Sequence, residues 1–208
     1  MKRILVSNNS KILVSFTVAY SLSGSEKVTE IKSGKFMNSL FRFIEIPEQA
    51  INVITTIYTI DFKGKKQLLG QDKQSKSISV CYEVYEDNNK PKFKIASCAK
   101  FMGAYALYGV NNSSSIVRAC ILYTVGKEGK YYISQPLKKG GFFTFVTPND
   151  VGTIKVKIEK AKDVSKNIWI NLYTEVFSKN PFPMQKCYEV TKPLLKDIQC
   201  KSIDCLKL

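Results

Sequence analysis

The chain has 208 residues, of which 44% are hydrophobic and 12% aromatic, so a core can be buried and wholesale disorder is excluded. Lysine and arginine number 32 against 17 aspartates and glutamates, which gives a net charge of +15. Histidine is absent, which removes the commonest general base, the usual nucleophile pairs and every histidine-containing metal site. We therefore expect a protein that is not an enzyme and that needs no cofactor.

Strand-like runs recur along the chain with turn signals between them. The first run, residues 12–22, alternates apolar and polar side chains, which favours a half-buried strand. The alternative is a signal peptide cleaved near Ser25, although a hydrophobic signal core has no need to alternate. The predicted strands are residues 12–22, 36–46, 51–62, 77–86, 93–110, 116–125, 131–134, 142–146, 153–160 and 167–177.

About ten strands joined by mostly short loops predict an all-β fold. The length favours an antiparallel two-sheet sandwich of jelly-roll type, because an open sheet of ten strands tends to curl or split. No repeat of about 33 to 45 residues is visible, which counts against propellers and solenoids. Pro181 and Pro183 place a boundary between a sandwich domain, residues 1–180, and a tail, residues 181–208. Apolar spacing between Thr191 and Ile198 allows a short helix in that tail.

Six cysteines permit several arrangements. Cys81, Cys98 and Cys120 lie in apolar strand-like runs, which favours buried free thiols and a reducing compartment. Disulfides in a secreted protein are the alternative. Cys187, Cys200 and Cys205 lack a fourth zinc ligand nearby, so no metal site is expected. Asparagine glycosylation sequons at Asn8, Asn111 and Asn112 matter only in a secretory setting.

The excess positive charge must lie on the surface, because unpaired buried cations are too costly. Such a surface attracts nucleic acid, acidic lipid headgroups or acidic glycans. Only Arg3, Arg42 and Arg118 are arginines, and a lysine-rich surface favours salt-sensitive binding that does not read sequence.

Three groups of lysines are candidates for this binding. The first is a basic loop after the strand 51–62, the second precedes two glycines and two phenylalanines, and the third lies on one face of the strand 153–160. Each group has an alternative role. The basic loop is a solvated run of charge, the second group belongs to a hairpin turn, and the third protects an edge strand against aggregation. The candidate residues are Lys63, Lys65, Lys66, Lys73, Lys76, Lys138, Lys139, Lys155 and Lys157.

The leading hypothesis is an intracellular protein that binds nucleic acid without sequence specificity. By fold analogy alone, small basic sandwiches suggest a viral movement or capsid role in an infected cytoplasm or virion. A second hypothesis is a self-assembling structural protein, a homo-oligomer with Tyr131, Tyr132 and Trp169 in its interfaces. A third is a secreted, disulfide-bonded binding module. No segment has the ~20 apolar residues of a membrane-spanning helix.

Overall fold

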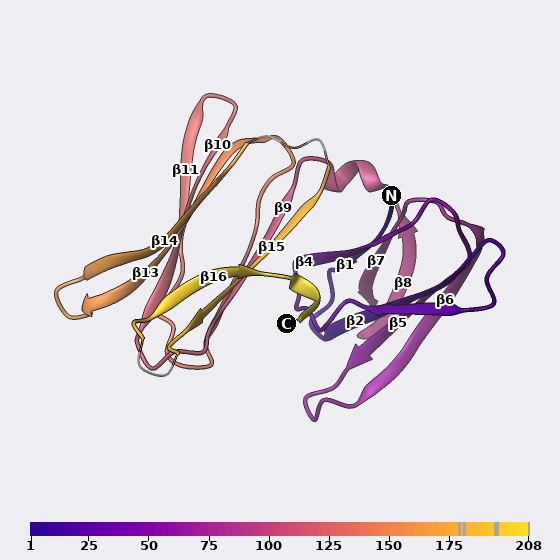
Figure 1. Ribbon diagram of the computed structural model, residues 1–208, viewed down its shortest axis with the longest axis horizontal. Coiled ribbons are helices and arrows are strands. Elements are labelled where there is room, and N and C mark those ends of the chain that lie inside the picture. The colour runs from indigo at the N-terminus through magenta and orange to yellow at the C-terminus, as the bar shows by residue number, and fades with distance from the viewer. Residues whose placement is uncertain (179, 181, 194–195, 208) are drawn as a thin grey trace. The chain divides into compact units, whose positions relative to one another are not determined.

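The computed structural model describes residues 1–178, 180, 182–193 and 196–207, and it is an all-β protein. Sixteen strands form four four-stranded sheets, and two short 3-10 turns, η1 (Cys98–Phe101) and η2 (Cys205–Lys207), follow strands (Figure 1). Within these residues no helix is long and apolar enough to cross a membrane. The strands divide between two compact units, which meet in sequence between Ala99 and Lys100.

Unit 1 comprises Met1–Ala99 and the C-terminal residues from Cys205 onward. Its first sheet has the order β4-β1-β7-β8, and its second has the order β3-β2-β5-β6. Its strands are β1 (Lys2–Asn8), β2 (Leu13–Leu22), β3 (Val28–Lys32), β4 (Leu40–Ile46), β5 (Ala50–Ile60), β6 (Lys66–Lys76), β7 (Val80–Asp87) and β8 (Lys90–Ala96).

Unit 2 comprises Lys100–Asp204, with sheets of order β12-β9-β15-β16 and β11-β10-β13-β14. One buried cluster draws side chains from β9, β12 and β15 of one sheet and from β10 and β13 of the other, so the two sheets form a sandwich. The strands are β9 (Tyr105–Asn111), β10 (Val117–Val125), β11 (Glu128–Ile133), β12 (Phe142–Val146), β13 (Val151–Asp163), β14 (Ile168–Phe177), β15 (Met184–Thr191) and β16 (Gln199–Ile203).

The two units repeat one topology strand by strand. Adding eight to each strand number of unit 1 reproduces both sheet orders of unit 2, including the single parallel pair, β1 with β7 and β9 with β15. Short peptides repeat as well: Asn-Asn-Ser at 8–10 and 111–113, and Cys-Tyr-Glu-Val at 81–84 and 187–190. The chain is therefore two copies of one eight-stranded sandwich.

A buried asparagine organises the same corner of each copy. Asn8 is fully buried, and its Nδ2 donates to the carbonyl of Ile12 at 2.7 Å while its Oδ1 accepts the Ser10 amide and hydroxyl. Asn111, equally buried, repeats this pattern with Ser115 and Ser113. Each side chain satisfies loop groups that would otherwise be buried without a partner.

The structure differs from several expectations. The described residues form sixteen strands rather than about ten, and one strand pair in each unit is parallel. Residues 93–110 are not one strand but β8, η1 and β9, and the basic loop after residue 62 is mostly the strand β6. The assignment of the sandwich to the jelly-roll type stays a prediction.

The division of the chain also differs from the expected sandwich of residues 1–180 and tail of 181–208. Residues 184–191 and 199–203 of that tail are β15 and β16, because unit 2 needs both to complete one sheet. The expected helix falls partly on residues 194–195, outside the described residues; beyond them the chain continues as strand β16 and the short 3-10 turn η2.

Asn8→Ala should lower the free energy of unfolding by roughly 2–3 kcal/mol, because it leaves buried loop carbonyls unpaired. Asn9→Ala is the matched control: the exposed Asn9 side chain donates to Glu83 at 2.6 Å at the surface, and its loss should cost no more than about 1 kcal/mol. Urea unfolding monitored by circular dichroism measures both. Equal stabilities for the two variants would show that the buried amide is not needed.

Candidate functional site

The nine candidate lysines share one property. None has an ion pair among the described residues, and all are exposed except Lys157, which is half-buried. Three glutamates that lie in strands pair with other cations: Glu45 with Arg3, Glu83 with Lys94 and Glu175 with Lys186. The candidate lysines are therefore free to meet an external anion.

The turn between β5 and β6 has a fixed backbone. Asp61 accepts the amides of Lys63 and Lys65 on Oδ1, at 2.9 and 2.8 Å. Its backbone carbonyl accepts the amide of Gly64 at 2.9 Å, and Gly64 has a φ of +81°, which suits glycine. The one carboxylate in this segment is thus occupied in holding the turn.

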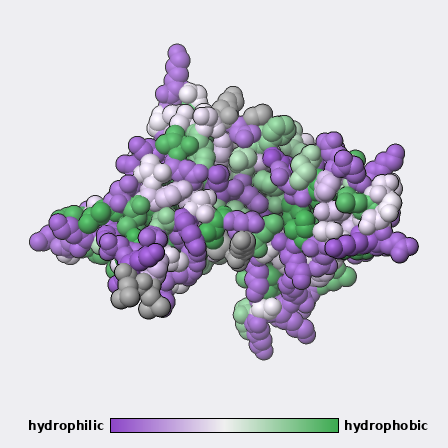
Figure 2. Space-filling view, in the orientation of Figure 1, coloured by the Kyte–Doolittle hydropathy of each residue, from purple (hydrophilic) through white to green (hydrophobic). Residues whose placement is uncertain are grey.

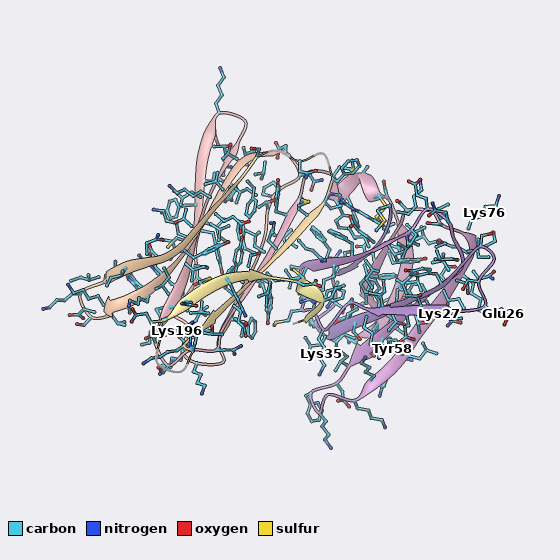
Figure 3. The ribbon with its side chains drawn as sticks, viewed as in Figure 1. Glu26, Lys27, Lys35, Tyr58, Lys76 and Lys196 are labelled. Atoms are coloured by element: carbon cyan, nitrogen blue, oxygen red, sulfur yellow. A yellow bond between two sulfur atoms is a disulfide. The ribbon has the colours of Figure 1, made fainter. Side chains whose placement is uncertain are left out.

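Four lysines and an exposed aromatic ring surround this turn. Phe62 is 94% exposed, and the Lys66 ammonium lies 5.4 Å from the ring centroid of Tyr58. Lys35 comes from the β3–β4 connection, and its ammonium lies beside Gly64 (Figure 3). The distance is 3.8 Å from Lys35 Nζ to the position that a Cβ on Gly64 would occupy. We call this group the hairpin tip; it consists of Lys35, Phe62, Lys63, Lys65 and Lys66.

Two lysines of the predicted basic loop lie elsewhere. Because β6 is extended, Lys73 and Lys76 are roughly 20–30 Å along the strand from the hairpin tip. Figure 3 shows Lys76 at the opposite end of β6 from the turn. The predicted loop therefore does not form one basic cluster.

The segment around Lys138 and Lys139 is a structural turn. The amide of Gly140 donates to Asn111 at 2.7 Å, and the amide of Gly141 donates to Lys138 at 2.8 Å, so neither is available to cradle an anion. Of the two phenylalanines, Phe143 is buried in the core and Phe142 stacks on Tyr108. The exposed side chains of this segment are the two lysines and part of the Phe142 ring, which is 42% exposed.

Lys155 and Lys157 do not guard a sheet edge. Their strand, β13, lies inside its sheet between β10 and β14, and both side chains belong to its outward face. Lys92 and Lys94, by contrast, lie on the edge strand β8 of the other unit and pair with Asp87 and Glu83. Edge protection explains the second pair of lysines but not the first.

A shallow groove of about 390 Å³ lies on that outward face. Tyr131, Leu122 and Lys155 are successive register partners across β11, β10 and β13, so they stand side by side on one face. Tyr131 is 76% exposed. The space-filling view shows apolar residues interspersed among hydrophilic ones on the surface of each unit (Figure 2). We call this surface the unit 2 outer face; it includes Leu122, Tyr131, Ile133, Lys155, Lys157 and Val176.

A charged cluster closes one end of the unit 2 outer face. Arg118 donates to Glu159 at 2.8 Å and lies 4.2 Å from the ring centroid of Trp169. Trp169 donates to Asn167 at 2.6 Å, and the Cys120 thiol lies 3.3 Å from Glu159. Glu159 is thus neutralised within the cluster, and the lysines carry the free charge of the face.

The cysteines differ from the expectation of free thiols. Cys81 and Cys98 form a disulfide, and Cys187 and Cys205 are also disulfide-bonded, which removes them as zinc ligands. Only Cys120 and Cys200 are free. Burial, helped by Glu159, raises the pKa of Cys120 to about 11, and burial beside Glu175 raises that of Cys200 to about 12.

Lys35, Phe62, Leu122 and Lys130 were not among the residues predicted from the sequence. Leu122 and Lys130 line the groove. For the hairpin tip a signal existed: Asp-Phe-Lys-Gly-Lys after a β-rich run is typical of a turn. For the groove no local signal existed, since its residues come from three strands. Trp169 and Tyr131 were noted only as interface aromatics.

No protein-family model matches this sequence, and comparison with curated proteins finds nothing similar. Solved structures give weak likenesses. The membrane-binding domain of pneumolysin is 12% identical with a TM-score of 0.35, over 49% of this chain and 96% of that one. A pneumolysin from Streptococcus pneumoniae is 8% identical with a TM-score of 0.35, over 74% and 40%. Listeriolysin O is 7% identical with a TM-score of 0.32, over 73% and 38%. These values carry no functional argument.

The two free thiols should resist alkylation in the folded protein. With a pKa of about 11, roughly one Cys120 thiol in a thousand is ionised at pH 8. Iodoacetamide should label both cysteines at least about a hundredfold more slowly than in urea, as followed by peptide mass spectrometry. Burial favours the protonated thiols and so adds to the free energy of unfolding. This contribution is present below the pKa of the thiols in the unfolded chain and is lost as the pH rises through their pKa in the folded protein. Equal labelling rates in the two states would contradict the burial of these groups.

Proposed function

We propose that the protein is a non-enzymatic binder of polyanions, first of all nucleic acid, and that the hairpin tip is a principal contact. The supporting observation is that the candidate lysines have no ion pairs among the described residues, while Glu45, Glu83 and Glu175 pair with other cations. Both units have an excess of positive charge, with 16 basic against 9 acidic residues in unit 1 and 16 against 8 in unit 2.

The hairpin tip suits a phosphate chain that is read without sequence. Lysine ammonium groups act as point charges, and each phosphate contact releases counterions, so affinity falls steeply with salt. Phe62 offers a ring face on which any base can stack. The turn is held by Asp61 before the ligand arrives, so little backbone ordering is needed on binding.

Lys63→Glu with Lys65→Glu should weaken binding to a labelled single-stranded RNA of about 20 nucleotides by tenfold or more. The slope of log affinity against log salt should fall by about two, one for each lost phosphate contact. Fluorescence anisotropy between about 50 and 200 mM salt measures both.

The matched control is Lys27→Glu with Lys90→Glu, two exposed lysines of unit 1 that have the same charge change and no ion pair among the described residues. An equal loss in the control would show that net charge, rather than the hairpin tip, governs binding. Affinity that does not depend on salt would reject polyanion binding altogether.

A secreted, disulfide-bonded module that binds acidic glycans is a second candidate. The disulfide between Cys81 and Cys98 favours it, because such bonds persist in oxidising compartments. The sequons at Asn8 and Asn111 lend it no support, since both side chains are buried and hydrogen-bonded within their loops. An intracellular site and homo-oligomer formation stay predictions.

Alkylation of the unfolded, unreduced protein should add two groups, at Cys120 and Cys200, and alkylation after reduction should add six. Intact mass spectrometry counts them. Six groups without reduction would show that the protein carries no disulfides and would remove the support for the secreted candidate.

A further inference from the structure

The unit 2 outer face combines apolar and cationic groups in adjacent rows. In one row Tyr131, Leu122 and Lys155 are register partners across three neighbouring strands. In the next row the partners are Ile133, Cys120 and Lys157. Neighbouring strands lie about 4.8 Å apart, so the ring and the lysine of one row start from backbones roughly 10 Å apart.

This face is more apolar than an outward sheet surface needs to be. Leu122 is 43% exposed, Ile133 47% and Val176 58%, all on the same face as Tyr131. Scattered exposed apolar residues are ordinary, but a contiguous group around a groove marks a binding surface.

The free charge on this face is positive. Glu159 is held by Arg118 and Cys120, and Glu128 lies 3.7 Å from Lys130. Lys155 and Lys157 have no ion pair among the described residues. The face is therefore complementary to an anion that also carries flat, apolar groups.

We propose that the unit 2 outer face binds single-stranded nucleic acid, with a base against Tyr131 and Leu122 in the groove and neighbouring phosphates on Lys155 and Lys157. This rests on the proposed function and adds to it a second contact, in unit 2, that requires unstacked bases. A duplex hides its base faces, so it can use the lysines but not the groove.

The chain contains its own reporter for this interaction. Trp169 is the only tryptophan, and its stacking on Arg118 places it on the same outward face. Trp169 pairs with Ala161, six residues along β13 from Lys155, so a thymidine oligonucleotide long enough to run about 20 Å along the face should change its fluorescence. A duplex of equal charge and inorganic polyphosphate are the two comparison ligands.

Tyr131→Ala should weaken binding of the single-stranded oligonucleotide at least about fivefold, because one stacked base is lost, and should leave duplex and polyphosphate binding unchanged. Tyr131→Phe keeps the ring and should bind as the parent protein does. The double variant Lys155→Ala with Lys157→Ala should weaken the binding of all three ligands. Lys162 is exposed and lies further along β13, so Lys162→Ala should weaken the binding of none of them by more than about twofold.

Oligonucleotide binding that leaves Trp169 fluorescence unchanged and does not respond to Tyr131→Ala would overturn this inference. The proposed function would then stand if the hairpin-tip variant still weakened binding. No binding to any nucleic acid would overturn both. Binding to phosphatidylserine vesicles without binding to oligonucleotides would overturn this inference in favour of an anionic lipid surface.

Discussion

A buried asparagine at the end of the first strand is the interaction on which each unit depends. Strand and loop must change direction there, and the turn leaves carbonyl and amide groups pointing into the protein. Asn8 and Asn111 supply donors and acceptors to these groups from a position without solvent access. Because an unpaired buried polar group is costly, replacing the amide by an apolar side chain would disturb the connection between the two sheets. The repetition of the pattern in both units shows that it belongs to the fold rather than to one local loop.

Once the sandwich is closed, its inner faces are committed to packing, and charge is confined to outward faces and turns. In this chain several acidic residues have structural roles, since Asp61 holds a turn while Glu159 and Glu175 join polar clusters inside unit 2. Among the lysines without an ion pair in the described residues, two groups stand out by position, one at a hairpin turn and one on the outward face of an inner strand. Both places present an aromatic side chain beside the lysines, Phe62 in one unit and Tyr131 in the other.

The duplication gives the two units different surfaces on one framework. The β5–β6 turn of unit 1 and the β13–β14 turn of unit 2 are both held by an aspartate, Asp61 or Asp163, that accepts backbone amides. The first turn carries the exposed Phe62 and unpaired lysines, whereas in the second Lys166 lies 3.9 Å from Asp163. Turns at the same place in the repeated topology thus carry different chemistry, because packing constrains the buried asparagine and the core positions but not the exposed side chains of a turn.

The sequence by itself determined the all-β class, most strand positions and the lysine character of the surface, because alternation with period two and excess charge are local properties. It also contained the repeated Asn-Asn-Ser and Cys-Tyr-Glu-Val peptides, but two short matches about a hundred residues apart do not by themselves reveal two domains. Only the tertiary structure showed that residues 184–191 and 199–203 complete a sheet, that Cys81 meets Cys98, and that β13 is an inner strand. All three features depend on the order of strands in the sheets, which is set by contacts between segments distant in the chain. For the same reason the groove beside Tyr131 could not be predicted, since three strands must pair in register before its residues meet.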